Sequence, residues 1–453
     1  MSSENTGGMR LMIVGDSMTQ GGSGDWTWRY RLWKWLKDEQ VNVTFTGPYI
    51  GTQQADEPSP PRPPPLYKSE DPPSSVRADG GYAKDVDEDF DSHHYSTWGR
   101  QCAQSRDVIE EIVSGHPTDL LLVMLGFNDI GWFVSDAKGT LESMTILVHN
   151  ARKANPRLKF AIANIPQRTY MDGREDLPRS TKEYNELLVT AITKWTTKES
   201  PIHLVKLAEE YVASEGSYDG LHPNALGEYQ IARAFSITLV DDFKLGLKPL
   251  AVPEHIPTRP LPSPSHFELV SSPAGVTATW DTVYGTYGYE FRSSVDDGEF
   301  STDDCHANRW DSHWAHDGQV YRAQVRSRYG ERKSKWTPVL SAMARPQLAA
   351  PPENVKVISV AKGVIVSWDR PHDENSAHII QYTIFWKDKE SSGFPALGGF
   401  KHSPAHIDEL EHGHRYDIWM ATWTIAGEGM FGPMQEVTVG HDGSLAEEED
   451  ASE

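Results

Sequence analysis

The sequence predicts an α/β domain followed by two smaller all-β modules, and three observations support this fold class. From residue 10 to about residue 245, short apolar stretches alternate with helical patterns, which is typical of a parallel sheet with helices on both faces. Prolines then recur between positions 249 and 264, and such a run forms a semi-rigid spacer. Beyond it, strand patterns occur in two similar sets. We therefore expect an α/β domain at residues 1–248, a linker at 249–261, modules at 262–345 and 351–440, and an acidic tail at 441–453.

Five apolar runs of the first domain predict the strands of a mainly parallel, five-stranded sheet, at residues 11–14, 43–46, 120–125, 160–165 and 202–207. These runs are apolar throughout rather than alternating, as expected for strands that are covered on both faces. Helical patterns predict the covering helices at residues 28–37, 105–114, 140–154, 181–198 and 225–243.

Residues 52–92 interrupt this alternation. They contain eight prolines between Pro58 and Pro73, then two adjacent glycines, then an acidic run at residues 85–91. Proline-rich runs favour an extended backbone, and a long segment of this kind inside a compact domain is usually functional or disordered. We expect a surface insertion, with a lid near the site as an alternative.

The two all-β modules repeat the same pattern. Residues 276–280 and 364–368 are β-rich runs that each end in a tryptophan, and residues 320–325 and 416–421 are equivalent later strands. Tyr416 follows Leu410 by six residues, a placement that suits the tyrosine corner of an immunoglobulin-like sandwich. Both modules resemble fibronectin type III domains, although residues 303–310 of the first are atypical. The resemblance implies contacts with a protein or a polysaccharide.

The composition excludes several classes of protein. A net charge of −22 repels nucleic acid phosphates and anionic lipids. No run of 18 apolar residues predicts a membrane span, and residues 1–9 lack a signal-peptide pattern. The two cysteines, Cys102 and Cys305, lie in different domains, which argues against a disulfide framework. We therefore expect a cytoplasmic protein, with non-classical secretion as an alternative.

Three polar clusters of the first domain are predicted to meet at one edge of its sheet. Gly15-Asp16-Ser17 follows the first strand, residues 126–129 follow the strand at 120–125, and residues 218–223 precede the last helix. Because the carboxyl ends of parallel strands converge on one rim, these clusters should lie close together.

The clusters contain the groups that acyl transfer requires. A serine hydroxyl such as that of Ser17 is a weak nucleophile that needs a neighbouring base, and His222 can accept its proton near neutral pH. Asp219 can hold the imidazole in the required tautomer. Asn128 and backbone N–H groups can donate to the oxyanion of a tetrahedral intermediate.

The first domain resembles the SGNH/GDSL hydrolases. The first block of that family matches Gly15-Asp16-Ser17, the third matches residues 126–129, and the last matches residues 219–223. The resemblance implies a flavodoxin-like, three-layer α/β/α sandwich and a serine esterase without metal or cofactor. By this resemblance Ser17, Asp219 and His222 are catalytic, and Ser17, Gly99 and Asn128 form the oxyanion hole. Gly99 departs from the pattern, because the usual Gly-Trp order is reversed in Trp98-Gly99.

Several alternatives remain open at this point. The substrate is a small-molecule or carbohydrate ester, and a carbohydrate O-acetyl esterase is one alternative. A binding or scaffold protein with an idle hydrolase domain is another. Cys305, His306, His313 and His316 could form a metal site, although histidines in such loops more often face solvent. We expect catalysis to lie wholly in residues 1–248 and the β-modules only to place the enzyme on its target. The alternative is that the modules fold back and complete the substrate site.

Overall fold

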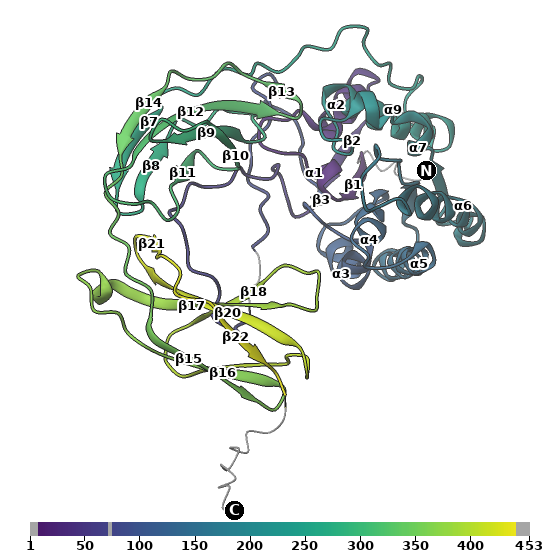
Figure 1. Cartoon of the computed structure of the whole chain (residues 1–453). Helices are drawn as coiled ribbons and strands as arrows, with labels where there is room; N and C mark the ends of the chain where they lie inside the picture. Colours follow the sequence, from purple (N-terminus) through teal and green to yellow (C-terminus); the bar gives the residue numbers. More distant parts are fainter. Residues whose placement is uncertain (1–7, 71–74, 441–453) are drawn as a thin grey trace, which may run out of the picture.

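The computed structural model describes residues 8–70 and 75–440 (Figure 1). The predicted acidic tail at 441–453 and the last two prolines of the insertion, Pro72 and Pro73, lie outside the described residues. No helix in the described ranges combines the length and the hydropathy that crossing a membrane requires. Cys102 and Cys305 are both buried and free.

The N-terminal domain is built on a parallel sheet in which five longer strands follow the order β2-β1-β4-β5-β6. This is the 2-1-3-4-5 order of flavodoxin-like sheets, and the five predicted strands are confirmed. A sixth strand of two residues, β3, pairs with the end of β1 and is too short to produce a sequence pattern. The strands are β1 (Met9–Gly15), β2 (Val43–Thr46), β3 (Tyr95–Ser96), β4 (Leu120–Met124), β5 (Lys159–Ala163) and β6 (Ile202–Val205).

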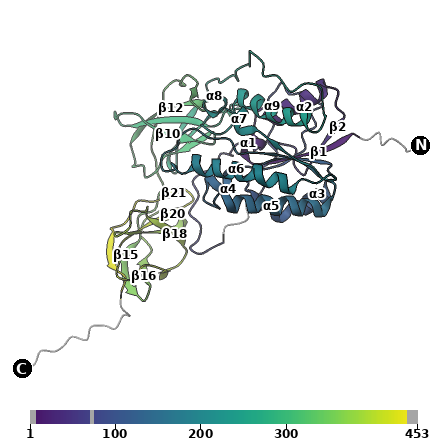
Figure 2. The same ribbon diagram turned by 90° about the vertical axis from the view of Figure 1, so that its right-hand side faces the viewer.

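Helices cover both faces of this sheet and complete the three-layer sandwich (Figure 2). One layer holds α2 (Thr27–Asp38) and α9 (Ala225–Asp241), and the other holds α3 (Cys102–Gly115), α5 (Ala137–Ala154) and α6 (Leu177–Trp195). Trp28 of α2 stacks on Phe235 of α9 with ring centroids 4.6 Å apart. Every residue of β4 is buried because both faces are covered. Four short helices follow strands or precede α9: α1 (Ser17–Gln20), α4 (Phe127–Gly131), α7 (Leu207–Glu210) and α8 (Ala213–Gly216).

Each C-terminal module is a sandwich of two antiparallel sheets. Trp280 and Trp368, which end the repeated β-rich runs, are both buried in their module cores. The first module contains β7 (Glu268–Ser272), β8 (Gly275–Thr279), β9 (Tyr289–Val295), β10 (Ser301–Cys305), β11 (Arg309–Asp311), β12 (Val320–Tyr329), β13 (Arg332–Lys333) and β14 (Leu340–Met343). The second contains β15 (Glu353–Val360), β16 (Gly363–Asp369), β17 (Ile379–Asp388), β18 (Ala396–Phe400), β19 (Ala405–Asp408), β20 (Arg415–Thr424), β21 (Gly427–Glu428) and β22 (Gln435–Thr438).

The predicted tyrosine corner is present in the second module. The Tyr416 hydroxyl accepts a hydrogen bond of 3.0 Å from the backbone N–H of Glu411. This bond ties the start of β20 to the loop before it, as in other immunoglobulin-like sandwiches.

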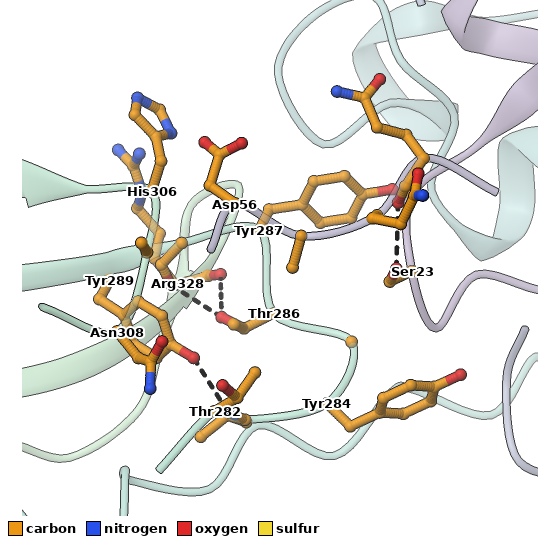
Figure 3. A pocket seen from close by; sticks show the side chains of 18 of the residues that line it. Ser23, Asp56, Thr282, Tyr284, Thr286, Tyr287, Tyr289, His306, Asn308 and Arg328 are labelled. Atoms are coloured by element: carbon orange, nitrogen blue, oxygen red, sulfur yellow. Dashed lines mark hydrogen bonds between the residues drawn. The ribbon is translucent and has the colours of Figure 1, made fainter. Parts of the chain in front are cut away.

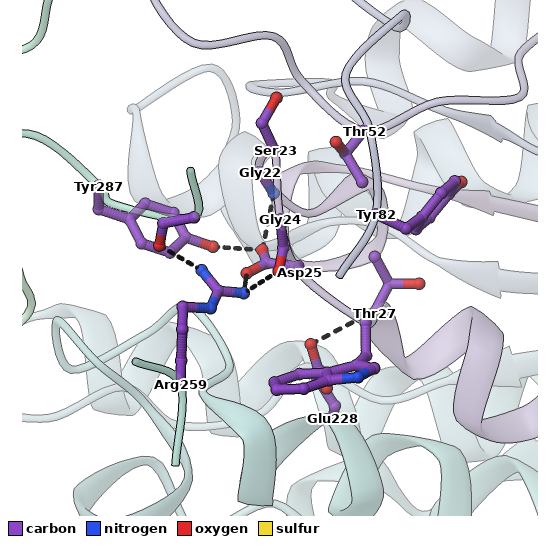
Figure 4. Close-up of polar contacts among 12 residues, drawn as sticks. Gly22, Ser23, Gly24, Asp25, Thr27, Thr52, Tyr82, Glu228, Arg259 and Tyr287 are labelled. Carbon is purple, nitrogen blue, oxygen red and sulfur yellow. Dashed lines mark hydrogen bonds and ion pairs between the residues drawn. The ribbon is translucent and has the colours of Figure 1, made fainter. Parts of the chain in front are cut away.

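The first module packs against the hydrolase domain through a buried ion pair (Figure 4). Arg259 of the linker bonds to the Asp25 carboxylate, and both side chains are at most 8% exposed. The Tyr287 hydroxyl also donates to Asp25. The backbones meet closely here, since a Cβ on Gly24 would lie only 2.5 Å from the Cα of Gly285. The first module is therefore docked rather than merely tethered.

Part of the proline-rich insertion crosses to the second module (Figure 1). We call residues 64–68 the strap. The Tyr67 N–H donates to the Gly399 carbonyl and the Gly399 N–H donates to the Pro65 carbonyl, both at 2.9 Å. The Tyr67 ring packs on Trp386 and Phe400, and its hydroxyl donates to Asp408 at 2.7 Å. The strap thus binds an edge of the second module.

Candidate active site

Ser17 lies at the carboxyl end of β1, as the first residue of α1. Asp16 caps this helix, because its carboxylate accepts the Met18 N–H at 3.0 Å. The cap turns the chain sharply at the end of the strand. Ser17 is consequently held at the rim of the sheet, and it is only 6% exposed.

His222 connects Ser17 and Asp219 through two short hydrogen bonds. Its Nε2 lies 2.9 Å from Ser17 Oγ, and its Nδ1 lies 2.6 Å from Asp219 Oδ2. The other Asp219 oxygen accepts the backbone N–H groups of His222 at 2.8 Å and Leu221 at 3.0 Å. The structure thus brings together the three residues that the sequence predicted as nucleophile, base and orienting carboxylate.

The two carboxyl groups near His222 differ in their tendency to ionise. Burial raises the pKa of Asp219, but the hydrogen bond from His222, the charge of that ring and two backbone N–H groups outweigh burial, so its pKa lies below the usual value. Burial raises the pKa of Asp16 to about 7, against the Met18 N–H and the charge of His222, which lower it. Asp219 therefore stays ionised beside the imidazole, as an orienting carboxylate must.

The predicted oxyanion donors lie at the same rim. Asn128, in α4 after β4, donates from Nδ2 to the Arg100 carbonyl at 2.9 Å, so it holds the loop that contains Gly99. This loop also contacts β1 and α1, since Thr97 N–H donates to the Gly15 carbonyl and Trp98 N–H donates to Gln20 at 2.7 Å.

Three donors remain available at this rim. Within the described ranges, the backbone N–H groups of Ser17 and Gly99 donate to no protein acceptor. Asn128 Nδ2 has a second hydrogen beyond the one it gives to Arg100. Gly99 has a φ of +72°, is partly exposed, and has no atom within 4 Å of the position that a Cβ would take. This arrangement can receive an oxyanion.

Two aromatic residues near His222 were missed from the sequence. The Trp98 ring stacks on the imidazole with centroids 4.7 Å apart and an interplanar angle of 14°, and the Tyr218 ring lies 5.7 Å away at 19°. Tyr218 in turn contacts Tyr287 of the first module, at 4.2 Å between centroids. The reversed Trp98-Gly99 order was the only sequence signal for this arrangement.

A cavity of about 690 Å³ lies between the hydrolase domain and the first module (Figure 3). Its hydrolase wall includes Trp98, Tyr218 and Asp219, all of which contact His222. The loop after α1 completes that wall with Gly22 and Ser23, and the insertion adds residues 53–56. The opposite wall comes from the module and consists of residues 282–289, residues 306–308, Arg328, Gly330 and Glu331.

The residues considered as a metal site do not come together. Cys305, His306, His313 and His316 form no ligand group in the described part of the chain. One other group there, at Asp388, Glu390 and His414 in the second module, has its ligand atoms within 4.8 Å of one another. Its members are engaged, because His414 pairs with Asp388 at 2.9 Å and Arg415 pairs with Glu390 at 3.0 Å. Pairing within the chain accounts for this group.

Comparison with solved structures returns carbohydrate esterases for the N-terminal region. A carbohydrate esterase family 3 protein from Talaromyces cellulolyticus is 24% identical, covers 52% of this chain and 98% of its own, and superposes with a TM-score of 0.40. A family 3 carbohydrate esterase from Clostridium thermocellum is 20% identical, covers 52% of this chain and 97% of its own, and gives a TM-score of 0.38.

Comparison with curated proteins matches a short region only. The interleukin-12 receptor subunit beta-2 of Sus scrofa is 35% identical over 89 residues, which are 18% of this chain. The match spans 10% of the length of that relative.

Models of known protein families match the N-terminal domain and the second C-terminal module. Residues 350–438 match the fibronectin type III domain, and residues 11–235 match the GDSL-like Lipase/Acylhydrolase family. The second match runs from the strand before Ser17 to the helix after His222. The N-terminal domain therefore belongs to the GDSL-like lipase/acylhydrolases and is an SGNH-type esterase domain, and residues 350–438 form a fibronectin type III domain.

Proposed function

We propose that the enzyme hydrolyses carboxylic esters by two-step acyl transfer through Ser17. The observation that supports this proposal is the continuous chain of hydrogen bonds from Ser17 Oγ through both ring nitrogens of His222 to Asp219. A serine is activated in this way when the base lies within hydrogen-bond reach and a third group orients the base.

In the first step, Ser17 Oγ attacks the ester carbonyl carbon while its proton passes to His222 Nε2. The carbonyl oxygen becomes an oxyanion, which the N–H groups of Ser17 and Gly99 and the Asn128 amide can stabilise. When the tetrahedral intermediate collapses, the bond to the alcohol oxygen breaks, and His222 gives its proton to that oxygen. An acyl-Ser17 and a free alcohol result.

In the second step, water replaces the alcohol. His222 removes a proton from the water as it attacks the acyl carbon, and then returns a proton to Ser17 Oγ as the carboxylic acid leaves. Asp219 stabilises the imidazolium in both steps, because its carboxylate stays ionised beside Nδ1.

A fluorophosphonate probe tests this role of Ser17. The wild-type chain should be labelled at Ser17, and Ser17→Ala should lose both labelling and turnover. Ser105→Ala is a matched control, because Ser105 is also buried and its hydroxyl has no hydrogen-bond partner in the described part of the chain. Turnover that survives Ser17→Ala would contradict the mechanism. Loss of both signals would also argue against a scaffold with an idle hydrolase domain.

We propose further that the second fibronectin type III module contacts a protein or polysaccharide partner. Such modules host many functions on one fold, and the exposed side chains Phe394, Leu397 and Ile425 lie on its surface. A pull-down that compares the full chain with Phe394→Ser and Ile425→Ser variants tests this role, since both substitutions leave the module core untouched.

A further inference from the structure

We propose that the cavity between the two domains binds the alcohol half of the ester, so that the first fibronectin-like module forms part of the active site. This inference rests on the acyl-transfer role proposed for Ser17. It assigns a ligand-binding wall to residues outside the hydrolase fold, in the loops before β9 and between β10 and β11 (Figure 3).

The position of the cavity indicates which half of the substrate it receives. Because the histidine protonates the leaving oxygen, the alcohol half must lie beside His222. Trp98 and Asp219 both line the cavity and both contact His222 directly. Asn128 and Gly99, on the oxyanion side, are not lining residues, and neither are Ser17 and His222 themselves. The cavity therefore adjoins His222 through Trp98 and Asp219, away from the oxyanion donors, and we assign it to the leaving-group side of the site.

The aromatic side chains of the cavity offer ring faces rather than hydroxyl groups. The Tyr284 hydroxyl donates to the Tyr82 carbonyl, and the Tyr287 hydroxyl donates to Asp25. The residues Trp98 and Tyr284 are 40% and 43% exposed. Aromatic rings present a large apolar surface to the C–H groups of a ligand.

The charged side chains of the cavity disfavour an anionic ligand. Arg328 pairs with Asp304 at 3.1 Å and Asp56 pairs with Arg77 at 2.6 Å, and the other charged lining residues, Asp219 and Glu331, are carboxylates. Thr282 and Asn308 supply a hydroxyl and an amide oxygen for hydrogen bonding. An anionic group would in addition meet a chain of net charge −22.

Ring faces combined with neutral hydrogen-bonding groups suit an alcohol with C–H faces and many hydroxyls. We therefore assign the cavity to a glycosyl unit rather than to a long acyl chain or a phosphorylated group. Small-ligand sites commonly combine apolar walls with a few placed polar groups in this way, and they often lie between domains.

The cavity is held open by the contacts between the domains. Asp25 accepts hydrogen bonds from Arg259, from Tyr287 and from the Gly22 N–H at 2.7 Å, and Arg259 also donates to the Gly285 carbonyl at 2.6 Å. Gly22, Gly285 and Tyr287 are themselves lining residues. The polar network in Figure 4 thus fixes both walls in place before a ligand arrives.

Two kinds of acetyl ester that differ only in the alcohol half test the proposal. The full chain is assayed on p-nitrophenyl acetate, whose leaving group is small and flat, and on the mono-O-acetyl esters of methyl β-xyloside, whose alcohol half keeps its other hydroxyl groups. Thr282→Trp and Ala307→Trp each add bulk to the module wall from a different loop. Thr302→Trp is the matched control, because Thr302 is exposed on β10 of the same module and does not line the cavity.

We expect both cavity variants to lose about tenfold or more in kcat/KM on the acetylated xylosides, mainly through KM, and to change less than twofold on p-nitrophenyl acetate. A loss of about this size corresponds to one or two displaced contacts. The Thr302→Trp control should match the wild type on both substrates.

Three results would overturn the assignment. These are an equal loss on both kinds of ester in the cavity variants, no loss on either, and a wild-type enzyme that hydrolyses p-nitrophenyl acetate but none of the acetylated xylosides. The Ser17→Ala chain separates this inference from the mechanism. If Ser17→Ala is inactive on p-nitrophenyl acetate while the cavity variants show no selectivity, the mechanism stands and only the cavity assignment fails.

Discussion

Asn128 makes two hydrogen bonds within the chain that orient its side-chain amide. Its Nδ2 donates to the Arg100 carbonyl, and its Oδ1 accepts the Trp132 Nε1–H at 2.9 Å. The second bond fixes the orientation of the amide, because a flipped amide would place its own NH2 donor opposite the indole N–H, which is also a donor. Trp132 is 68% exposed, so its position near the site is explained better by this bond than by packing.

Asn128→Ala should lower kcat by about 10²–10³-fold with little change in KM, the usual effect of removing one oxyanion donor. Steady-state kinetics on p-nitrophenyl acetate measures kcat and KM separately. Asn150→Ala is a matched control, since Asn150 also donates to a backbone carbonyl, that of Arg106 at 2.8 Å, but lies in α5. A pure KM effect in Asn128→Ala would instead assign the residue to substrate binding.

Asp16 should make the hydrolase domain less stable as the pH rises. Its folded pKa of about 7 exceeds the usual aspartate value, so between these values the folded state binds more protons than the unfolded state. Stability then falls with rising pH. Asp16→Asn retains an acceptor for the Met18 N–H without the charge, so it should gain stability relative to the wild type between pH 5 and pH 8, by on the order of 2 kcal/mol.

The midpoints of thermal unfolding of both proteins at pH 5, 6.5 and 8 test this expectation. A difference between the two proteins that stays constant with pH would show that Asp16 is ionised over the whole range.

At the scale of single elements, the strap depends on Tyr67. The ring of Tyr67 lies 5.2 Å from that of Phe400 and 5.7 Å from that of Trp386, and the hydroxyl bonds to Asp408. The prolines beside it favour an extended backbone before binding, so little conformational freedom is lost when the strap pairs with Gly399.

Tyr67→Ala should weaken the contact between the strap and the second module by roughly 1–3 kcal/mol, through lost burial of a half-buried aromatic ring. Hydrogen exchange at the backbone amides of Tyr67 and Gly399, which are bonded across this contact, should become faster. Tyr170→Ala, at a residue that is 74% exposed, should leave both amides unchanged. Unaltered exchange in Tyr67→Ala would mean that the backbone bonds alone hold the strap.

The elements that carry strong local patterns were predictable from the sequence. The strands before Ser17 and Asn128 are buried on both faces and read as apolar runs, and the residues after them follow family blocks. The strap and the Trp98 stacking were not predictable, because neither has a periodic signal. Arg259 and Asp25 are 234 residues apart, and nothing in a proline-rich linker indicates that one of its arginines will be buried against a distant carboxylate.

At the scale of the whole molecule, the ion pair between Arg259 and Asp25 helps to fix the position of the first module against the hydrolase domain. Both charges are buried, so removing one partner leaves the other without compensation. Arg259→Ala should lower the stability of the domain interface by about 3–5 kcal/mol. Arg259→Ala combined with Asp25→Asn should recover part of this loss, because no buried charge then remains unpaired.

Differential scanning calorimetry of the full chain measures this effect. Arg345→Ala is the control, since Arg345 pairs with Asp317 at 2.9 Å with both side chains more than half exposed, and such surface pairs contribute about 0–1 kcal/mol. Equal midpoints for Arg259→Ala and Arg345→Ala would contradict a central role for the buried pair.

The three domains follow one another along the chain, and the strap connects the first of them directly to the last. The chain leaves the hydrolase domain, passes through both modules, and meets a segment of its starting domain again where Tyr67 lies on β18. Two lengths must therefore agree, that of the strap and that of the path through the modules. A homologous chain that lengthens the connection between its modules would have to lengthen its strap as well. A shortened chain that ends before residue 351 would leave the prolines and the Tyr67 ring with no surface to cover them. Proteases should then cleave that segment before the rest of the chain.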